Sequence, residues 1–351
     1  MLTIVFYRIE GPPFTGHSYL TTPMGGSEIA IIHLARSLVK LGHKVYVFNK
    51  TDTERVYDGV IYKNFHEINE LKDLVDIFII FNEENCNLIP AKSVLLWNTI
   101  FLDFQDNNIL NLLNDNKIKK IIHVSNWQNE YHLYYLPYIS REYFHVINNP
   151  VWLNENIETQ ERQQFRLIST FHPNKGLKHL FRLFPKIKKQ IPEVELFVFG
   201  SETLYGENKD TRLKIIKDLG IDPTGIHLKQ SISQYDLSIE YCKSYLFLHP
   251  GLRGLEETSS ICTLEAQGYG TVPIVTDAGA LAETVGDSGI IVEGDIRFPE
   301  VEKKYIDKVI ELIFDKEKWE YLSKKGIEKI RNYYSPDIIS KKWEKLFLKL
   351  L

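Results

Sequence analysis

The sequence predicts an α/β protein built from two doubly wound domains. The chain has 351 residues, which is long for one compact core and suits two domains of about 150 residues each. Short apolar runs alternate with amphipathic stretches, a pattern typical of parallel strands joined by crossover helices. A turn-rich, polar stretch over residues 148–164 interrupts this alternation and predicts a linker. We therefore expect one domain over 1–152 and a second over 153–335.

The first domain is expected to hold six strands. The run at its start carries no basic leader, so we interpret it as a buried strand and not as a secretion signal. Between the first two strands, apolar residues from Ile29 to Leu41 recur at helical spacing, and Gly42 suits a left-handed C-cap. The amphipathic stretch 336–351 is expected to pack back on this domain. The predicted strands are 2–7, 44–48, 77–81, 93–97, 120–124 and 143–147.

The second domain continues the same alternation of strands and helices. Two sheets of this kind, each covered by crossover helices, make two Rossmann-like domains, and we expect them to face a central cleft. In open parallel sheets, ligands bind beyond the carboxyl ends of the strands. The candidate site residues are therefore sought at those ends. The predicted strands are 166–169, 196–200, 226–229, 245–249, 272–276 and 289–292.

Composition limits the classes of partner. Apolar residues make up 44% and charged residues 25% of the chain, which is ordinary for a soluble globular protein. The formal net charge of −4 gives no reason to expect nucleic acid. Lysine groups at 117–120 and 186–189 are typical of solvated helix faces, with weak peripheral attraction to an anionic membrane as the alternative. No apolar run approaches the ~20 residues that span a bilayer. We expect a cytoplasmic protein, with the inner face of the membrane as an alternative.

The first candidate site follows the first strand. A long loop ends at Gly25 and Gly26, which open the first predicted helix. Glycines let a ligand approach the backbone N–H groups, and a helix N-terminus favours an anion. The alternative is that Ser27 or Glu28 only caps the helix.

The second candidate site follows the strand that ends at His249. Two carboxylates, Glu257 and Glu265, flank Ser259 and Ser260 at a predicted helix N-terminus, with Glu265 expected two turns into the helix. A loop carboxylate can face a reacting sugar, serines and N–H groups can hold phosphate, and a helical carboxylate can accept ribose hydroxyls. The alternative is a solvated surface helix, which the apolar strands on either side make less favourable.

Four segments together resemble the family 4 glycosyltransferases, a group of retaining enzymes with the two-domain GT-B fold. Their order and the gaps between them match the family as well as their residues do. The likeness covers most of the chain and is weakest over 59–113. The segments are 25–28 with 41–45, 169–177, 257–268 and 279–285.

This resemblance implies roles for individual residues. Glu257 would be a catalytic residue beside the transferred sugar, and Lys175 would serve catalysis by neutralising the donor phosphates. Glu265 would bind the donor ribose, and Gly25 and Gly26 would line the same cleft. The other donor-binding candidates are Arg253, Thr258, Ser259, Ser260 and Ile261.

Two departures from the family pattern change these expectations. Many relatives carry an arginine where this chain has Thr170, so Arg253 is a substitute cation. Relatives often carry a histidine where this chain has Asn98, and an asparagine cannot exchange a proton. Asn98 and His172 are therefore expected only as acceptor or cleft residues.

The expected activity is retaining transfer of a sugar from a nucleotide-diphosphate sugar to a glycan, lipid or other hydroxyl acceptor. The acceptor hydroxyl would attack from the face on which the diphosphate departs. No Asp-x-Asp pair follows a predicted strand, so neither a metal nor another cofactor is expected. A dehydrogenase is disfavoured because no Gly-x-Gly-x-x-Gly turn follows a strand. A non-catalytic nucleotide-sugar-binding subunit and a nucleotide-sugar epimerase remain alternatives.

Overall fold

The computed structural model describes residues 1–52, 54–82, 88–101, 111–113, 115, 117–158, 160–205 and 209–351. Two compact units divide the chain. We placed residues 20–24 in the first domain, whereas the structure assigns them to the second unit, whose main part begins at Val151. Unit 1 comprises Met1–Tyr19, Gly25–Pro150 and Tyr334–Leu351, and unit 2 comprises Leu20–Met24 and Val151–Tyr333.

Unit 1 contains an eight-stranded sheet in the order β3-β4-β2-β1-β5-β6-β7-β8. All its neighbouring strands are parallel except β3 and β4. Its central strands are buried because their sequences are nearly continuous apolar runs, as expected for a sheet covered on both faces. The strands are β1 (Thr3–Tyr7), β2 (Lys44–Asn49), β3 (Arg55–Tyr57), β4 (Val60–Asn64), β5 (Val75–Phe81), β6 (Ala91–Asn98), β7 (Lys120–His123) and β8 (Phe144–Val146).

The sequence analysis missed the hairpin formed by β3 and β4. Its two turn residues, Asp58 and Gly59, both have positive φ, at 48° and 79°. Two such residues are typical of a tight hairpin turn, and Asp-Gly is a known sequence signal for it. The strands escaped notice because β3 has only three residues, none of them buried, so no apolar run marks it.

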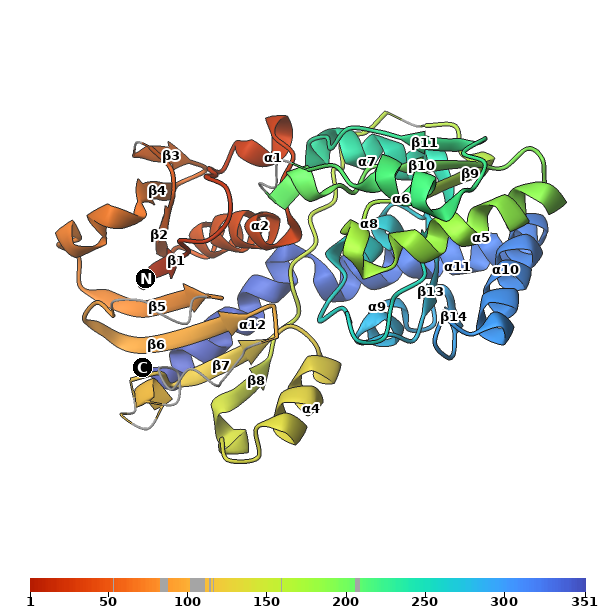
Figure 1. The fold of residues 1–351 in the computed structure, drawn as a ribbon. Helices are drawn as coiled ribbons and strands as arrows, with labels where there is room; N and C mark the ends of the chain where they lie inside the picture. Colours follow the sequence, from red (N-terminus) through yellow and green to blue (C-terminus); the bar gives the residue numbers. More distant parts are fainter. Residues whose placement is uncertain are drawn as a thin grey trace. The chain divides into compact units, whose positions relative to one another are not determined.

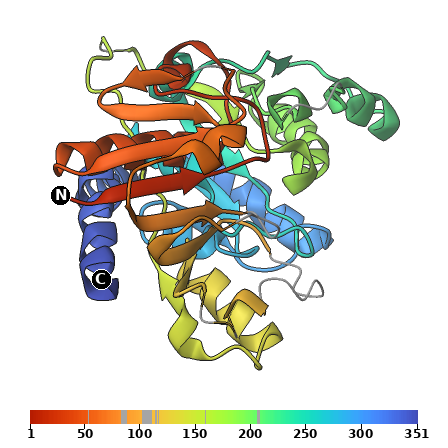
Figure 2. The same ribbon diagram turned by 90° about the vertical axis from the view of Figure 1, so that its left-hand side faces the viewer.

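The last helix of the chain, α12 (Pro336–Leu350), packs against α2 (Gly26–Lys40), as Figure 2 shows. Ser37 Oγ on α2 donates a hydrogen bond of 3.1 Å to Asp337 on α12. The buried Trp343 ring lies 5.1 Å from the Trp97 ring of β6. The chain terminus therefore completes the core of unit 1. The other helices that the structure describes in this unit are α4 (Asn126–Tyr135), η1 (Phe65–Glu70) and η2 (Arg141–Tyr143), while α1 (Ser18–Thr21) begins in unit 1 and ends in unit 2.

Unit 2 contains a six-stranded, all-parallel sheet in the order β11-β10-β9-β12-β13-β14. Its strands β12 and β13 are buried along their whole length. The strands are β9 (Gln163–Ser169), β10 (Glu195–Val198), β11 (Ile226–Leu228), β12 (Ser244–His249), β13 (Val272–Thr276) and β14 (Ile290–Val292).

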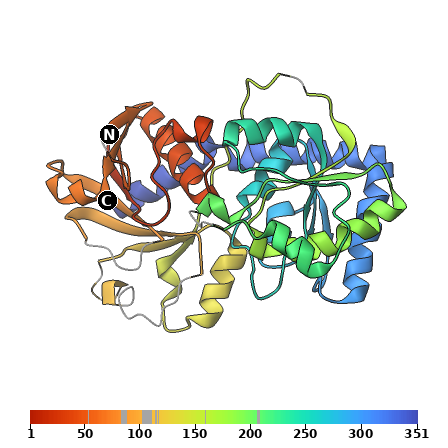
Figure 3. The ribbon, with the colours of Figure 1, turned by 45° about the horizontal axis from the view of Figure 1, so that its top comes forward.

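Helices cover both faces of the unit 2 sheet (Figures 1 and 3). On one face α5 contacts α6 and α10, and on the other α8 contacts α7, α9 and α11. Within the described part of the chain, no helix is both long and apolar enough to cross a membrane. The helices are α5 (Leu177–Gln190), α6 (Arg212–Leu219), α7 (Gln234–Lys243), α8 (Ile261–Gly268), α9 (Leu281–Val285), α10 (Pro299–Phe314), α11 (Lys316–Lys329), with the single turns η3 (Pro173–Lys175), η4 (Glu202–Tyr205) and η5 (Ile330–Tyr334).

The strand order of unit 2 reverses between β9 and β12. From β9 the chain proceeds outward through β10 and β11, and then returns to β12 on the other side of β9. The loops that leave the carboxyl ends of β9 and β12 therefore run to opposite faces of the sheet. A crevice at such a switch point is where doubly wound sheets bind ligands.

Candidate functional site

Lys175 is held at the switch point by the loop that follows β9. His172 caps the turn η3 by accepting a hydrogen bond from the Asn174 N–H at 3.2 Å. The next residue, Gly176, has a φ of 126°, and a Cβ there would lie 2.2 Å from the Pro250 carbonyl oxygen. Glycine therefore lets this loop approach the loop after β12. Across that contact, Lys175 Nζ donates to the Glu256 carbonyl oxygen at 2.5 Å.

His249 and Glu257 lie on the other side of this contact. His249, the last residue of β12, is fully buried and stacks on Phe171 with ring centroids 3.9 Å apart. Burial and the Lys175 charge lower the pKa of His249 to about 3. Its Nε2 is 3.8 Å from Glu257 Oε1, and a neutral ring forms no ion pair there. The cation beside Glu257 is therefore Lys175.

The pKa of Glu257 reflects two opposing effects. Burial raises the pKa of this carboxyl, and the positive charge of Lys175 acts in the opposite direction. The backbone of Glu257 is fixed by a parallel bridge to Gly279 and by the Ala280 N–H, which donates to the Glu257 carbonyl oxygen at 2.7 Å. Gly279 has a φ of 63° and touches Glu257 so closely that a Cβ would lie 2.6 Å from that oxygen.

The helix α8 begins directly after this loop. Ser260 is its N-cap, but the Ser260 hydroxyl lies 2.8 Å from the Thr263 hydroxyl and caps no backbone N–H. Thr258 is buried, while Ser259 and Ile261 are partly exposed. Glu265 is the fifth residue of α8 and lies about one turn into the helix. The expectation of two turns was wrong because the helix begins at Ile261.

Glu265 is buried among polar groups that the sequence analysis did not identify. Gln234, the first residue of α7, donates from Nε2 to Glu265 Oε1 at 2.5 Å. Burial raises the pKa of Glu265 to about 7, although hydrogen bonding from Gln234 and Tyr241 lowers it. Burial and the charges of both Glu257 and Glu265 raise the pKa of the Cys262 thiol to about 12. The two carboxylates therefore share one neighbourhood around Cys262.

The structure shows the contacts of Thr170 and Arg253, the two residues that concern the missing arginine of the family pattern. Thr170 Oγ1 lies 2.7 Å from the Tyr241 hydroxyl, so this position contributes a hydrogen bond in place of a charge. Arg253, the expected substitute cation, is half exposed and pairs with Asp277 at 2.9 Å. The Lys175 ammonium donates to the Glu256 carbonyl oxygen, which is uncharged, whereas Arg253 is paired with a carboxylate. Lys175 is therefore better suited than Arg253 to bind an anion.

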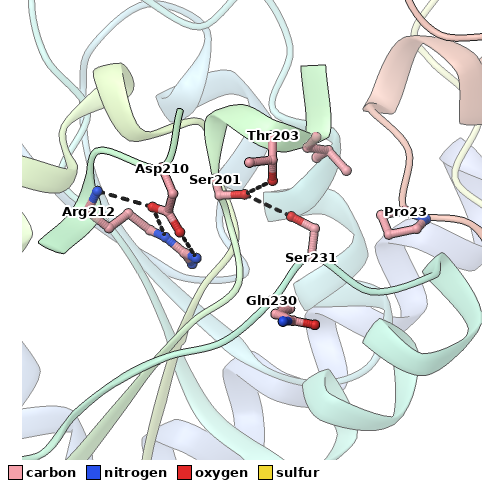
Figure 4. Close-up of a pocket in the computed structure, with 8 residues that line it drawn as sticks. Pro23, Ser201, Thr203, Asp210, Arg212, Gln230 and Ser231 are labelled. Carbon is pink, nitrogen blue, oxygen red and sulfur yellow. Dashed lines mark hydrogen bonds and ion pairs between the residues drawn. The ribbon is translucent and has the colours of Figure 1, made fainter. Parts of the chain in front are cut away.

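A pocket of about 470 Å³ lies at the carboxyl ends of β10 and β11 (Figure 4). Most of its polar lining consists of hydroxyl and amide groups. The guanidinium of Arg212 is engaged by Asp210 and by the carbonyl oxygens of Val198 and Lys229. The sequence analysis did not predict this pocket. Its lining residues are Pro23, Ser201, Thr203, Leu204, Asp210, Arg212, Gln230 and Ser231.

The candidates of unit 1 are placed differently. Gly25 is the N-cap of α2 and Gly26 its first residue. Glu28 in the first turn of α2 binds Arg8 at 2.7 Å in a buried ion pair, so a carboxylate already lies near this helix end. Asn98 is fully buried, and its Oδ1 accepts a hydrogen bond from the Ile100 N–H at 3.1 Å. This hydrogen bond shapes the turn after β6, and the expected role of Asn98 as an acceptor or cleft residue stays a prediction.

Comparison with known families identifies the chain. Residues 151–329 match the model of the glycosyl transferases group 1 family, and this match spans more than half of the 351 residues. The chain belongs to this family. It is a glycosyltransferase, and membership implies a nucleotide-sugar donor and a glycan acceptor. No curated protein sequence matches the chain.

Solved structures of glycosyltransferases share the fold of the chain. Sucrose-phosphate synthase from Thermosynechococcus elongatus is 14% identical, with a TM-score of 0.73 over 100% of this chain and 99% of that one. HepE of Anabaena, solved in complex with UDP-glucose, is 13% identical, with a TM-score of 0.71 over 99% and 100%. A glycosyltransferase from Rickettsia africae is 15% identical, with a TM-score of 0.68 over 99% and 98%. The expected GT-B class of two Rossmann-like domains is confirmed.

Proposed function

We propose that this glycosyltransferase is a retaining enzyme of family 4 that uses a nucleotide-diphosphate sugar. The observation that supports the proposal is that Lys175, at the switch point between β9 and β12, donates to the Glu256 carbonyl oxygen and so brings its charge near the Glu257 carboxylate. A cation there can neutralise a leaving diphosphate, and a carboxylate beside it can stabilise positive charge that develops on the sugar ring. The proposed acceptor is a hydroxyl of a glycan or of a lipid-linked sugar.

The donor would extend along the carboxyl edge of the unit 2 sheet. Lys175, with Ser259 and Ser260 at the start of α8, would hold the diphosphate, and Glu265 would accept the ribose hydroxyls. Neighbouring strands lie about 4.8 Å apart, so the three steps from β12 to β11 span roughly 14 Å. That length suits a donor with its sugar near β12 and its base near β11.

The pocket beside β10 and β11 is the proposed site of the nucleobase. The Arg212 guanidinium is engaged by Asp210 and two backbone carbonyl oxygens, so the residues described in the lining offer neutral hydrogen-bonding groups and no unpaired charge. A base, which is neutral and carries several donors and acceptors, suits this lining better than a phosphate does. Gln230, Ser201 and Ser231 are the side chains proposed to contact it.

The proposed reaction is front-face transfer. The acceptor oxygen forms a bond to the anomeric carbon while the bond from that carbon to the diphosphate oxygen breaks on the same face. The acceptor proton passes to an oxygen of the leaving diphosphate. No protein base at the sugar is proposed, because His249 is too weakly basic at a pKa of about 3 and Asn98 cannot exchange a proton.

We further propose that the enzyme acts in the cytoplasm without a divalent metal, with the membrane's inner face as an alternative location. Lys175 and the N-terminal end of α8 supply positive potential to the leaving group. Among the described residues, no group of three or more His, Cys, Asp or Glu side chains is placed to hold a metal ion. Activity should survive exhaustive treatment with EDTA. Complete loss that returns with magnesium or manganese would contradict metal independence.

Product stereochemistry tests the central proposal. The purified protein would be incubated with UDP-, GDP- and ADP-sugars and a panel of hydroxyl acceptors, and the new linkage examined by NMR. We expect the anomeric configuration of the donor to be retained. An inverted linkage would refute front-face transfer. Donor binding without transfer or hydrolysis would favour the non-catalytic subunit, and release of an epimerised nucleotide sugar would favour the epimerase.

A further inference from the structure

The side chain of Gln234 makes a contact that the proposed roles of the donor site leave unexplained. Gln234 is buried and begins α7, whereas Glu265 lies in α8, 31 residues later in the chain. Its amide nitrogen Nε2 donates to Glu265 Oε1 at 2.5 Å. A neutral amide donor can hold a carboxylate in one orientation without neutralising its charge.

The loop that carries Gln234 also reaches the proposed base pocket. Gln230 and Ser231, which line that pocket, precede Gln234 in the same connection between β11 and α7. Ser233 in this loop caps α7, since its Oγ accepts a hydrogen bond from the Asp236 N–H at 3.1 Å. This cap fixes where α7 begins and therefore the position of Gln234. One short connection thus carries both the pocket lining and the residue that donates to Glu265.

We propose that Gln234 is a positioning residue that orients the Glu265 carboxylate for the donor ribose. The inference rests on the proposed function, because it deepens the ribose role given there to Glu265. The ribose lies between the base and the diphosphate of any such donor. A residue that ties Glu265 to the connection beside the base pocket would therefore set the distance between the base site and the ribose site.

The orientation of a carboxylate matters because a ribose offers two neighbouring hydroxyls. A carboxylate in the correct rotamer can accept from both hydroxyls, whereas a rotating one loses part of that interaction. Gln234 also acts on the protonation of Glu265, since its hydrogen bond lowers a pKa that burial raises to about 7. Loss of Gln234 should therefore weaken ribose recognition and shift its pH dependence upward.

The test compares ribose and deoxyribose ligands. Dissociation constants for UDP and 2′-deoxy-UDP, and for GDP and 2′-deoxy-GDP, would be measured by calorimetry on the full chain. The variants are Gln234→Met, which keeps the length without a donor, Gln234→Ala, Glu265→Gln and the double variant Gln234→Met/Glu265→Gln. Tyr235→Ala, a change at the next residue of α7, is the matched control.

The native protein should bind the ribose form of the preferred nucleotide about tenfold more tightly than the deoxy form, as expected for hydrogen bonds to a charged group. Gln234→Met should lose most of this preference, and Tyr235→Ala should keep it. The double variant should match Glu265→Gln alone, because Gln234 acts through that carboxylate. The pH midpoint of ribose binding should move upward in Gln234→Met.

Three outcomes would overturn the inference, and they are distinguishable. A Gln234→Met protein with the native ribose preference and the native pH midpoint would show that Gln234 does not position Glu265. A Glu265→Gln protein with the native preference would refute the ribose role of Glu265 itself. An additive loss of ribose preference in the double variant would show that Gln234 does not act through Glu265. If Gln234→Met fails to fold, Gln234→Ala is judged by the same criteria.

Discussion

Lys175 and Glu256 join the two loops that leave the switch point of unit 2, through a hydrogen bond of 2.5 Å from the lysine ammonium to the Glu256 carbonyl oxygen. The contact places a cation beside Glu257, the next residue in the chain. A carbonyl oxygen is a weaker partner for an ammonium than a phosphate is, so the same cation can turn to an incoming diphosphate.

Lys175→Ala should weaken binding of nucleoside diphosphates by about tenfold or more and leave nucleoside binding nearly unchanged, because only the former carry the phosphate charge. Calorimetry with UDP and uridine, and with GDP and guanosine, would measure both affinities. Lys178→Ala, which removes an exposed lysine at the second residue of α5, is the control. Equal losses for diphosphate and nucleoside would remove Lys175 from the phosphate site.

Glu257→Gln and Glu265→Gln should have different kinetic effects. Glu257 is proposed to act in the transition state, so its amide should depress kcat by roughly 100-fold, or about 3 kcal/mol, with donor affinity within a few-fold of the native value. Glu265 is proposed to bind ribose in the ground state, so its amide should raise the KM for the donor. Steady-state constants for both variants decide this. A Glu257→Gln enzyme with a normal kcat would be incompatible with a catalytic carboxylate.

The raised pKa of Glu265 predicts a cost in stability at alkaline pH. The pKa of about 7 in the folded protein lies above the reference value of 4.5. Folding then favours the protonated carboxyl, so its stability contribution is complete below pH 4.5 and is lost as the pH rises to 7. Above pH 7, the buried anion should destabilise unit 2 by about 3 kcal/mol relative to acid pH.

Glu265→Gln should therefore resist urea better than the native protein at pH 8 and unfold at nearly the same urea concentration at pH 4.5. The control is Glu193→Gln, at an exposed position of the same unit. Urea midpoints at the two pH values would measure the difference. The same gain from Glu265→Gln at both pH values would argue against a titrating buried carboxylate.

Gly176→Ala should disrupt the site through the backbone. A Cβ at this residue would lie 2.2 Å from the Pro250 carbonyl oxygen, at a φ of 126° that alanine rarely adopts. We expect a loss of about 3 kcal/mol in stability together with weaker donor binding. Gly220→Ala is a matched control, because Gly220 also has a positive φ, 61°, but faces open space. It should cost only about 1 kcal/mol. Equal urea midpoints for the two variants would contradict the close approach of the two loops.

Local patterns in the sequence predicted much of the fold and part of the site. The twelve expected strands coincide with strands of the structure because a buried parallel strand is marked by a short apolar run that is visible in the chain itself. Glu257 and Glu265 were singled out by their spacing after the strand that ends at His249, whereas the resemblance to family 4 glycosyltransferases pointed to Lys175, and all three roles stay predictions. The Asp58-Gly59 pair is a sequence signal for a hairpin turn, but the hairpin was missed because its strands are too short to form an apolar run.

Only the tertiary structure decided which distant side chains meet. Gln234 reaches Glu265, Lys175 reaches Glu256, and Asp277 takes the charge of Arg253 that was expected for the donor. Each contact joins loops or helix starts whose separation depends on the strand order β11-β10-β9-β12-β13-β14. Apolar periodicity reports whether a segment is buried, but it contains no information on which strand lies beside which, because every interior strand of a parallel sheet presents the same kind of apolar surface.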